Sequence, residues 1–510
     1  PAPVLRDFET LNLHARHASH DDPDAIDSIL AEAMALDPVK QGIILKALKE
    51  GTGLPLGDLR AQIKRLGKDD APDHLELARA VLDGIGRENL ISTAAGVWRW
   101  QDRGVWQEQV DRAVKQSVQS VIDDKGQRVT NTAVVGVSDV LKTEIFRPDH
   151  AFNIGNPESV NCQNGLAVLD GGVWTLHPHR REDYRTTQIP VAFDPTADAP
   201  RFRQFLSDVF RDDPDHDDKV TAMCELIGYS LMSHAHHERF VMLFGEAGTG
   251  KSILLAIIEA LVGKANVSGV QPSKFDGFQR AHMRDKLVNI VTELKQGEVI
   301  ADAALKSITS GEVTTTEQKH RDPFDLHLFC TNWFATNHMP HTRDFSNALM
   351  RRAVILTFNR VFAQTDDENV ALKKTDTHFG PEMPGILTAC LSAYAGALAR
   401  GWTIPASSLE AVREWRREAD SVAQFVDDRC EVSPGANTLH SVLFDDYLRY
   451  AAQEHIKMPV GSKEFGKRME RLKYPKGKDG HGQRTLGGIK LVAPQMMGGF
   501  GMNMTGSQPN

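Results

Sequence analysis

Hydrophobic residues divide the chain into segments with different periods. Near the N-terminus they recur every three to four positions, as in residues 26–34 and 43–48, which predicts short helices. Residues 96–100 and 173–176 instead alternate between apolar and polar side chains, as half-buried strands do. A helical period returns after residue 201. The first part of the chain is therefore expected to be helical and the second part mixed.

From residue 233 the pattern changes to short apolar runs. Runs of five or six residues, each ending at a polar position, alternate with helical stretches. This rhythm is typical of a parallel sheet with crossover helices, so we predict an α/β fold with a parallel-sheet core. Ser433-Pro434-Gly435 indicates a linker into a small C-terminal module. The predicted segments are a helical region at 1–90, a mixed α/β module at 91–232, the core at 233–365, a helical extension at 366–432, the small module at 433–493 and a disordered tail at 494–510.

Length and composition narrow the class of protein. A chain of 510 residues is long enough for about three domains. The net charge of −9 excludes a protein coated with positive charge, although it leaves room for local basic patches. Five scattered cysteines without a Cys-x-x-Cys pair favour a reducing cytoplasm over a disulfide or zinc scaffold. With neither a membrane-spanning apolar run nor a secretory signal in the sequence, we expect a cytoplasmic protein without membrane contact.

A glycine-rich loop lies between the apolar run at residues 240–244 and a helical pattern at residues 253–262. It reads Gly245-Glu246-Ala247-Gly248-Thr249-Gly250-Lys251-Ser252. This is the GxxxxGK[ST] motif in the strand–loop–helix context that it requires, which an ordinary Gly-rich turn lacks. The glycines let backbone N–H groups face phosphates, while Lys251 reaches the β- and γ-phosphates and Ser252 binds Mg²⁺. We therefore expect ATP and Mg²⁺ at this loop.

Two polar residues that end later apolar runs are candidates for ATP hydrolysis. Glu293 stands where a carboxylate can polarise the attacking water, and it can help Ser252 to hold Mg²⁺. Taken without the loop upstream, such a residue is more often a solvated strand end. Asn332 ends the run at residues 326–332 and can hydrogen-bond the γ-phosphate or orient the water. A turn-capping role for Asn332 is the alternative.

Arg351 and Arg352 immediately precede another apolar run, at residues 353–358. Arginines at such a position can act as a finger that stabilises the γ-phosphate in the site of a neighbouring subunit. The alternative is an ordinary surface pair, which the two arginines alone would favour. We predict that one of the two is the finger, and the sequence does not distinguish them.

A group of histidines close to the glycine loop is a weaker candidate site. His234, His236 and His237 could ligate a metal ion, but Glu238 is the only carboxylate at ligand spacing and no cysteine accompanies them. We therefore expect that the protein's metal site is the Mg²⁺ site at Ser252 and Glu293 rather than this group.

The order and spacing of these motifs resemble those of superfamily 3 helicases. Lys251, Glu293, Asn332 and Arg351 are separated by 42, 39 and 19 residues, which is a compact core with a third motif that ends in Asn. The segment at 304–312 and the pairs Met339-Pro340 and Thr357-Phe358 are similar to further parts of this family. Within the family, the chain is most similar to the phage and plasmid primase-helicases, which are related to the poxvirus primase-helicase. The resemblance covers residues 90–492.

The resemblance implies an AAA+ ATPase that forms a hexameric ring, binds ATP between subunits and moves 3′-to-5′ on one DNA strand. In the family, a β-hairpin before the third motif projects into the channel, and Lys319 and His320 fall at its place. A basic residue beside an imidazole can hold DNA phosphate, whereas a solvated hairpin tip is the alternative. Relatives often carry a primase domain upstream. Residues 1–90 offer no convincing carboxylate pair for metal, so we expect a primase or polymerase as a partner.

The C-terminal module has a separate DNA-binding pattern. Helical patterns at residues 439–453 and 463–472 and a Gly-rich hairpin predict a winged-helix-like fold. Between residues 463 and 490 the sequence has nine Lys or Arg against three acidic residues, which favours contact with DNA phosphates. A wing that docks another protein is the alternative. The candidate DNA-binding residues of the second helix are Lys463, Lys467, Arg468 and Arg471.

These features predict an ATP-dependent DNA helicase that replicates a phage, plasmid or other mobile element. Its expected partners are single-stranded and forked DNA and further copies of the same chain. The alternative is an initiator or regulator that binds DNA and uses ATP only as an assembly switch. DNA-stimulated ATP turnover together with strand displacement distinguishes the two hypotheses, because a switch hydrolyses ATP slowly and unwinds nothing.

Overall fold

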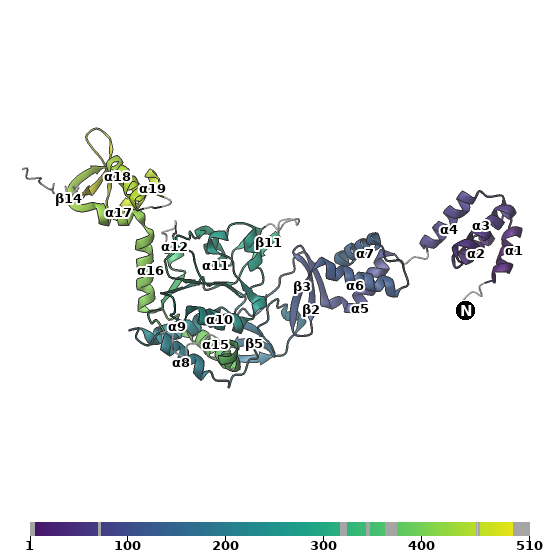
Figure 1. Ribbon diagram of the computed structural model, residues 1–510, viewed down its shortest axis with the longest axis horizontal. Helices are drawn as coiled ribbons and strands as arrows, with labels where there is room; N and C mark the ends of the chain where they lie inside the picture. The colour runs from purple at the N-terminus through teal and green to yellow at the C-terminus, as the bar shows by residue number, and fades with distance from the viewer. Residues whose placement is uncertain are drawn as a thin grey trace, which may run out of the picture. The chain divides into compact units, whose positions relative to one another are not determined.

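The computed structural model describes residues 6–69, 73–316, 324–342, 347–362, 375–454, 456 and 459–492. The chain divides into two compact units (Figure 1). Unit 1 consists of Pro1–Asp102 and Trp106–Ala151, and unit 2 of Arg103–Val105 and Phe152–Asn510. Among the described helices, none is both long enough and apolar enough to cross a membrane.

Unit 1 begins with a bundle of four helices. Their hydrophobic faces bury Leu30, Ile44 and Leu48 completely. Aspartates cap the helix starts, since the Asp22 side chain accepts the N–H of Ala25 at 3.0 Å. The acidic segments between the periodic stretches are thus helix caps. The helices are α1 (Phe8–His17), α2 (Pro23–Met34), α3 (Pro38–Thr52) and α4 (Leu56–Asp69).

A second core of unit 1 packs three helices with an antiparallel sheet of order β1-β2-β3. Val81, Val118 and Leu141 come from the three helices and are all buried in this core. The predicted boundary after residue 90 is therefore wrong, because the helix before it and the strands after it share one core. The elements are α5 (His74–Ile85), β1 (Leu90–Thr93), β2 (Gly96–Gln101), β3 (Val105–Gln109), α6 (Asp111–Asp124) and α7 (Asn131–Glu144).

Unit 2 contains a five-stranded sheet of order β13-β7-β12-β9-β8, in which all the paired strands are parallel. This confirms the predicted parallel sheet. At one edge of the sheet Phe244 pairs with both Thr336 and Thr357, so three strands end level with one another. The strands are β7 (Phe240–Phe244), β8 (Val267–Ser268), β9 (Val288–Val291), β12 (Thr331–Thr336) and β13 (Ala353–Thr357), and the helices among them are α10 (Lys251–Val262), α11 (Asp302–Thr309) and α12 (Asn347–Met350).

Residues on both sides of this sheet in the sequence share its hydrophobic core. Trp174 donates its indole N–H to the carbonyl of Leu391 at 2.8 Å, which joins a small antiparallel sheet to α15. Helices α9 and α15 cross at Gly228, where a Cβ would lie 2.3 Å from the carbonyl oxygen of Cys390. The predicted boundaries at 232 and 365 therefore do not separate packing units. These elements are β4 (Ser159–Cys162), β5 (Gly165–Asp170), β6 (Val173–His177), α8 (Pro200–Val209), α9 (His216–Tyr229), α14 (Thr375–His378) and α15 (Met383–Arg400).

The apolar run predicted as one strand at residues 326–332 is divided between two structures. Strands β10 (Val313–Thr316) and β11 (Phe324–His327) form an antiparallel pair outside the main sheet. The sheet strand β12 begins only at Thr331. The prediction was wrong because Asn332 is a polar residue inside a buried strand, where Asn289 of β9 donates to its side-chain oxygen at 3.1 Å.

The chain ends in a helix and a small mixed module (Figure 1). The helix, α16 (Ala406–Ala419), packs against the edge strand β13. Ser433-Pro434-Gly435 belongs to a strand rather than the predicted linker, since β14 pairs with β16 on both sides of an irregularity between Val432 and Asn437. The sheet has the order β14-β16-β15. The elements are α17 (Ser421–Arg429), β14 (Cys430–Leu439), α18 (His440–Gln453), α19 (Ser462–Arg471), β15 (Lys476–Lys478) and β16 (Arg484–Leu491).

Candidate functional site

The glycine loop lies between the end of β7 and the start of α10. Gly248 and Gly250 have φ angles of 79° and 93°, which side chains other than glycine rarely adopt. At Gly245 a Cβ would lie 2.3 Å from the carbonyl oxygen of Phe358, so the close approach of two backbones requires glycine there. The first N–H groups of α10 have no partners within the helix and can bind an anion. The predicted strand–loop–helix geometry is thus present.

Lys251 is folded into the loop that precedes it. Its ammonium donates to the carbonyls of Gly245 and Glu246, both at 2.6 Å, and to the hydroxyl of Thr249 at 3.2 Å. The residue is only 8% exposed, and burial lowers the pKa of its ammonium. These acceptors are uncharged, so an incoming phosphate would be a stronger partner for the ammonium than the loop is.

Glu293 and Ser252 lie at the same edge of the sheet as the loop. Val291 at the end of β9 pairs with Phe334 of β12, so Glu293, two residues later, is level with Thr336. Both Glu293 and Ser252 are exposed. A hydroxyl and a carboxylate oxygen are ligands that Mg²⁺ accepts, and the exposed edge leaves room for the waters that it retains. The donor set therefore fits the predicted Mg²⁺.

Asn332 does not lie at this edge. It is fully buried near the amino end of β12, and β12 continues for four more residues before it reaches the level of the loop. At about 3.3 Å per residue, that is roughly 13 Å away. The prediction that Asn332 contacts the γ-phosphate is therefore wrong. The polar residue that follows the true strand end is Asn337, which is exposed. The signal for it in the sequence was the apolar run at 333–335, which the strand prediction missed.

Arg351 and Arg352 lie at the opposite, amino edge of the sheet. The backbone N–H of Phe240, the first residue of β7, donates to the carbonyl of Arg352 at 2.9 Å. The two side chains differ in environment. That of Arg351 is 65% exposed and has one ion pair, to Glu238 at 3.0 Å. That of Arg352 is 8% exposed and binds Glu238, Ser310 and the carbonyl of Ala348.

The histidine group has a fixed hydrogen-bond pattern. Ligand atoms of Glu158, His234 and His236 lie within 4.8 Å of one another, close enough for a metal ion. However, Nδ1 of His234 accepts the backbone N–H of His236 at 3.2 Å, which leaves the ring proton on Nε2, 3.4 Å from Glu158. Glu158 also accepts the hydroxyl proton of Tyr394 at 2.5 Å. Metal binding through Nε2 would disrupt this pattern.

The predicted hairpin residues Lys319 and His320 lie outside the described residues. The strands on either side of them, β10 and β11, are antiparallel, with Val313 paired to His327. A hairpin before β12 is therefore present, in agreement with the sequence.

A basic groove of about 550 Å³ lies in the C-terminal module, between α19 and the strands β15 and β16. Two of the predicted residues, Lys463 and Lys467, line it. Arg468 does not, because it is only 4% exposed and forms ion pairs with Asp420 at 3.3 Å and Glu464 at 3.7 Å. The prediction that Arg468 contacts DNA is therefore wrong. Arg471 is exposed but lies outside the groove lining.

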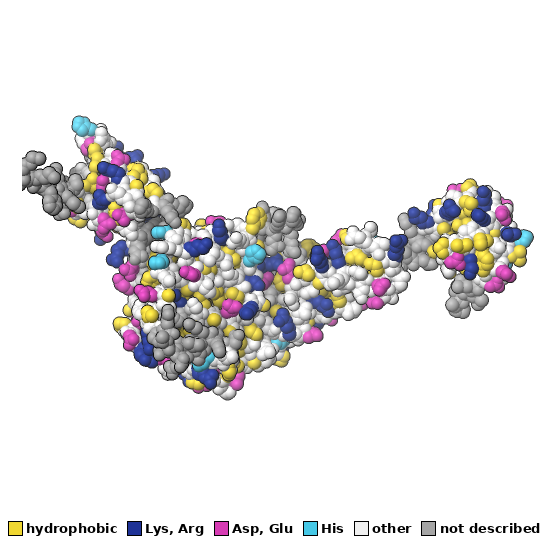
Figure 2. All heavy atoms as spheres, in the orientation of Figure 1, with side chains coloured by type: hydrophobic (Ala, Val, Ile, Leu, Met, Phe, Trp, Pro, Cys, Tyr) yellow, Lys and Arg dark blue, Asp and Glu magenta, His cyan; other side chains and the backbone are white. Residues whose placement is uncertain are grey.

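Three further cations line the same groove: Lys476, Lys478 and Arg484. No carboxylate is among the described lining residues. The pKa of His440 in the groove is lowered by burial and also by Arg484 and Lys476. Elsewhere, acidic and basic side chains are interspersed over the face shown in Figure 2, so contact with a polyanion depends on local clusters such as this one.

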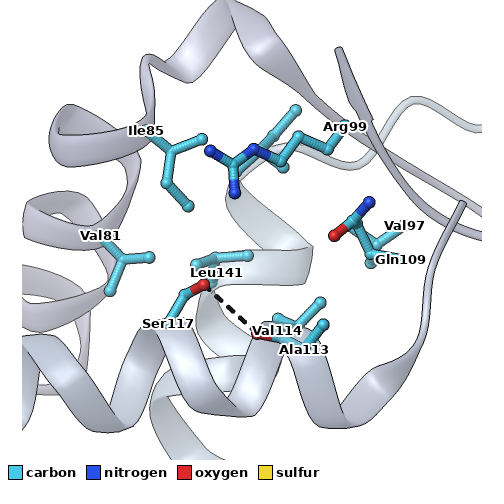
Figure 3. A pocket seen from close by; sticks show the side chains of 10 residues that line it. Val81, Ile85, Val97, Arg99, Gln109, Ala113, Val114, Ser117 and Leu141 are labelled. Carbon is cyan, nitrogen blue, oxygen red and sulfur yellow. Dashed lines mark hydrogen bonds between the residues drawn. The ribbon is translucent and has the colours of Figure 1, made fainter. Parts of the chain in front are cut away.

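A small cavity in unit 1 lies among α5, α6, α7 and the strands β1, β2 and β3 (Figure 3). Its volume is about 20 Å³, which is room for about one water molecule. The nearby hydroxyl of Ser117 is already a donor to the carbonyl of Ala113 at 3.3 Å. This cavity is too small for a ligand, so it is not a candidate site.

Two parts of the chain match known protein families. Residues 78–211 match the family described as D5 N terminal like, and residues 243–352 match a family of unknown function, DUF5906. The second match contains the glycine loop, Glu293 and the arginine pair. The chain is also 22% identical over 348 residues to "Putative helicase 184R" of Invertebrate iridescent virus 6. That alignment covers 59% of this chain, which spans only 35% of the viral protein.

Solved structures of the NrS-1 C terminal region are similar to this chain. One covers 79% of this chain and 86% of its own, with 12% identity and a TM-score of 0.43. Another covers 82% of this chain and 100% of its own, with 12% identity and a TM-score of 0.44. At these levels of similarity, function depends on the site itself.

Proposed function

We propose that the protein is an ATP-dependent DNA helicase that acts in the replication of a virus, phage or plasmid. The observation that carries the proposal is the glycine loop, which joins a parallel strand to a helix and encloses Lys251. The similarity to a viral protein named as a helicase and the D5 N terminal like region support the same function. A phage- or virus-type primase-helicase is the family that these features favour.

ATP hydrolysis would use the carboxyl edge of the sheet. The phosphates bind the N–H groups at the start of α10, and Lys251 transfers its ammonium from the loop carbonyls to the β- and γ-phosphates. Mg²⁺ bound by Ser252, with Glu293 close by, neutralises the charge of the phosphates. Glu293 accepts a proton from the attacking water, and Asn337 is close enough in level to orient that water.

The arginine pair would serve a second subunit. Strand β7 is five residues long, or about 17 Å, and it separates the loop from the amino edge where Arg351 lies. Arg351 therefore cannot reach its own subunit's γ-phosphate along this face, but it is free to enter a neighbour's site. Because Arg352 is buried, we assign the finger to Arg351. This supports an AAA+-type ring, which the family resemblance predicts to be hexameric.

DNA contact would involve two regions. The hairpin that carries Lys319 and His320 pulls one strand, and the basic groove of the winged-helix-like module binds the phosphates of forked or duplex DNA. Five cations that line this groove supply the contact: Lys463, Lys467, Lys476, Lys478 and Arg484. A primase or polymerase partner remains part of the proposal.

The test is ATP turnover and strand displacement on a forked DNA with a single-stranded tail. The wild-type protein should hydrolyse ATP faster with DNA and separate the strands, and Glu293→Gln should bind ATP without either activity. An exposed acid outside the site, Glu312, provides the matched control in Glu312→Gln. Slow turnover that DNA does not accelerate, without unwinding, would refute the helicase and favour the ATP-switched initiator.

A further inference from the structure

Glu238 lies in the loop between α9 and β7, two residues before the sheet begins. Its φ angle of 51° is unusual for a residue with a side chain. The carboxylate binds three groups from two other parts of the chain. One oxygen lies 3.0 Å from Arg351 and 2.9 Å from Arg352, and the other accepts the hydroxyl proton of Ser310 at 3.1 Å. The loop thus holds an uncommon backbone conformation at a point where its side chain joins several elements.

Ser310 connects this carboxylate to the base of the β10–β11 hairpin. It follows α11 directly and precedes β10 by three residues, and it also accepts a hydrogen bond from Arg352 at 2.8 Å. The next residue, Gly311, is packed so closely that a Cβ there would lie 3.2 Å from Cβ of Ala235, in the loop that carries Glu238. A shift at the hairpin base would therefore be felt by the Glu238 loop.

We propose that Glu238 is a positioning residue that sets the direction of Arg351 and links it, through Ser310, to the base of the hairpin. The inference rests on the proposed function, since it concerns how DNA at the hairpin changes ATP hydrolysis in the neighbouring subunit. Arg352 is the buried anchor of the node formed by Glu238, Ser310, Arg351 and Arg352. Arg351 is its exposed and movable member, because Glu238 is its single ion-pair partner among the described residues.

The chemistry of the node explains how such a link would work. Both guanidinium groups share one oxygen of Glu238, while Ser310 occupies the other. If the hairpin base moves Ser310, the hydrogen bonds of both Glu238 and Arg352 change, and the share of the carboxylate available to Arg351 changes with them. The state of the hairpin is thereby transmitted to an exposed arginine without any contact between the two.

Ser310→Ala tests the link to the hairpin. The ratio of DNA-stimulated to basal ATP turnover should fall about five-fold or more, the lower end of typical coupling between two sites. Ser307→Ala is the matched control, because Ser307 lies on α11 and its hydroxyl has no hydrogen-bond partner among the described residues. If Ser310→Ala and Ser307→Ala keep the same stimulation ratio as wild type, the link is refuted. If wild type itself shows no stimulation, the proposed function fails instead.

Glu238→Gln tests the positioning of Arg351. It should lower kcat about ten-fold with the KM for ATP unchanged, as expected when one charge-assisted hydrogen bond to the finger is lost. Glu312→Gln serves as the control for charge. In mixtures, Lys251→Ala subunits should restore turnover to Glu238→Gln subunits, because they supply an intact node to the intact loop of the neighbour. A raised KM, or no rescue at any mixing ratio while Arg351→Ala is rescued, would overturn the inference.

Discussion

Replacing Arg351 and Arg352 separately by Ala tests whether adjacent arginines have different roles. Arg351 is 65% exposed and contributes one ion pair, whereas Arg352 is 8% exposed and has three partners. A surface ion pair stabilises a protein little, because water and salt screen it. A buried guanidinium that binds a carboxylate, a hydroxyl and a carbonyl contributes more. We therefore expect Arg352→Ala to affect stability and Arg351→Ala to affect catalysis.

The magnitudes follow from these partners. Loss of the Arg352 hydrogen bonds should lower the free energy of unfolding by about 2 kcal/mol, discounted because Glu238 is itself partly exposed. For a large domain this corresponds to a Tm lower by about 4–8 °C. Arg351→Ala should cost less than about 1 kcal/mol. If Arg351 is the finger, the same change should reduce kcat about a thousand-fold or more, since that is the lower range for arginine fingers.

Three measurements check this prediction: thermal melting, binding of a fluorescent ATP analogue and ATP turnover with single-stranded DNA. Arg351→Ala should bind the analogue and melt like wild type but not turn over. Mixed with Lys251→Ala, it should regain part of the activity, because some interfaces then combine an intact loop with an intact finger. The analogue should bind because the loop lies at the other edge of the sheet.

Two results would refute the reasoning. If Arg352→Ala melts like wild type, its buried contacts do not contribute as the distances suggest. If Arg351→Ala turns over normally, or is not rescued at any mixing ratio, no finger acts between subunits from this position. The opposite pattern, with catalysis lost only in Arg352→Ala, would make Arg352 the finger and require its contacts to open.

Three further predictions address the remaining sites. Lys251→Ala should abolish ATP turnover and leave the melting temperature within a few degrees, as measured by turnover and melting. Lys463→Ala combined with Lys467→Ala should flatten the log–log salt dependence of binding to duplex DNA by about 1.8, at ~0.9 per phosphate contact, and Arg468→Ala should leave it unchanged; fluorescence anisotropy across a salt series decides. Burial lowers the pKa of His237 to about 4, so between pH 6.5 and 4 the unfolded chain binds more protons and stability falls as pH falls. His237→Gln should flatten this slope in denaturant titrations, whereas the lowered pKa of Glu158 acts only below about 4.5.

The carboxyl edge of the sheet was largely predictable. Residues 240–244 and 353–358 are apolar runs with clear boundaries, and the glycine loop fixes which end of its strand carries the site. Glu293 was found for the same reason, because a polar residue ends a buried run. Such signals are local, and they depend only on the order of residues along one strand.

Asn332 was misplaced because its environment is not local. It pairs with Asn289 on the neighbouring strand, and two buried amides that satisfy each other need not end a strand. Arg468 was misplaced in the same way, since its partner Asp420 is 48 residues earlier in the chain. In both cases a polar residue looked exposed in sequence because the group that allows its burial lies far away. The groove residues Lys476, Lys478 and Arg484 needed the opposite information, namely which strand faces the helix.

The parallel sheet also explains why one chain can carry half of two sites. Because the paired strands run in the same direction, each residue that follows a strand lies at one edge and each residue that precedes one lies at the other. The glycine loop and Glu293 follow strands, while Glu238 and the arginine pair precede them. Strand β7 keeps the two groups about 17 Å apart, which is longer than an arginine side chain. A finger at Arg351 can therefore complete only the site of a second copy, and the hairpin base that binds Glu238 is on the side that faces that copy's ATP.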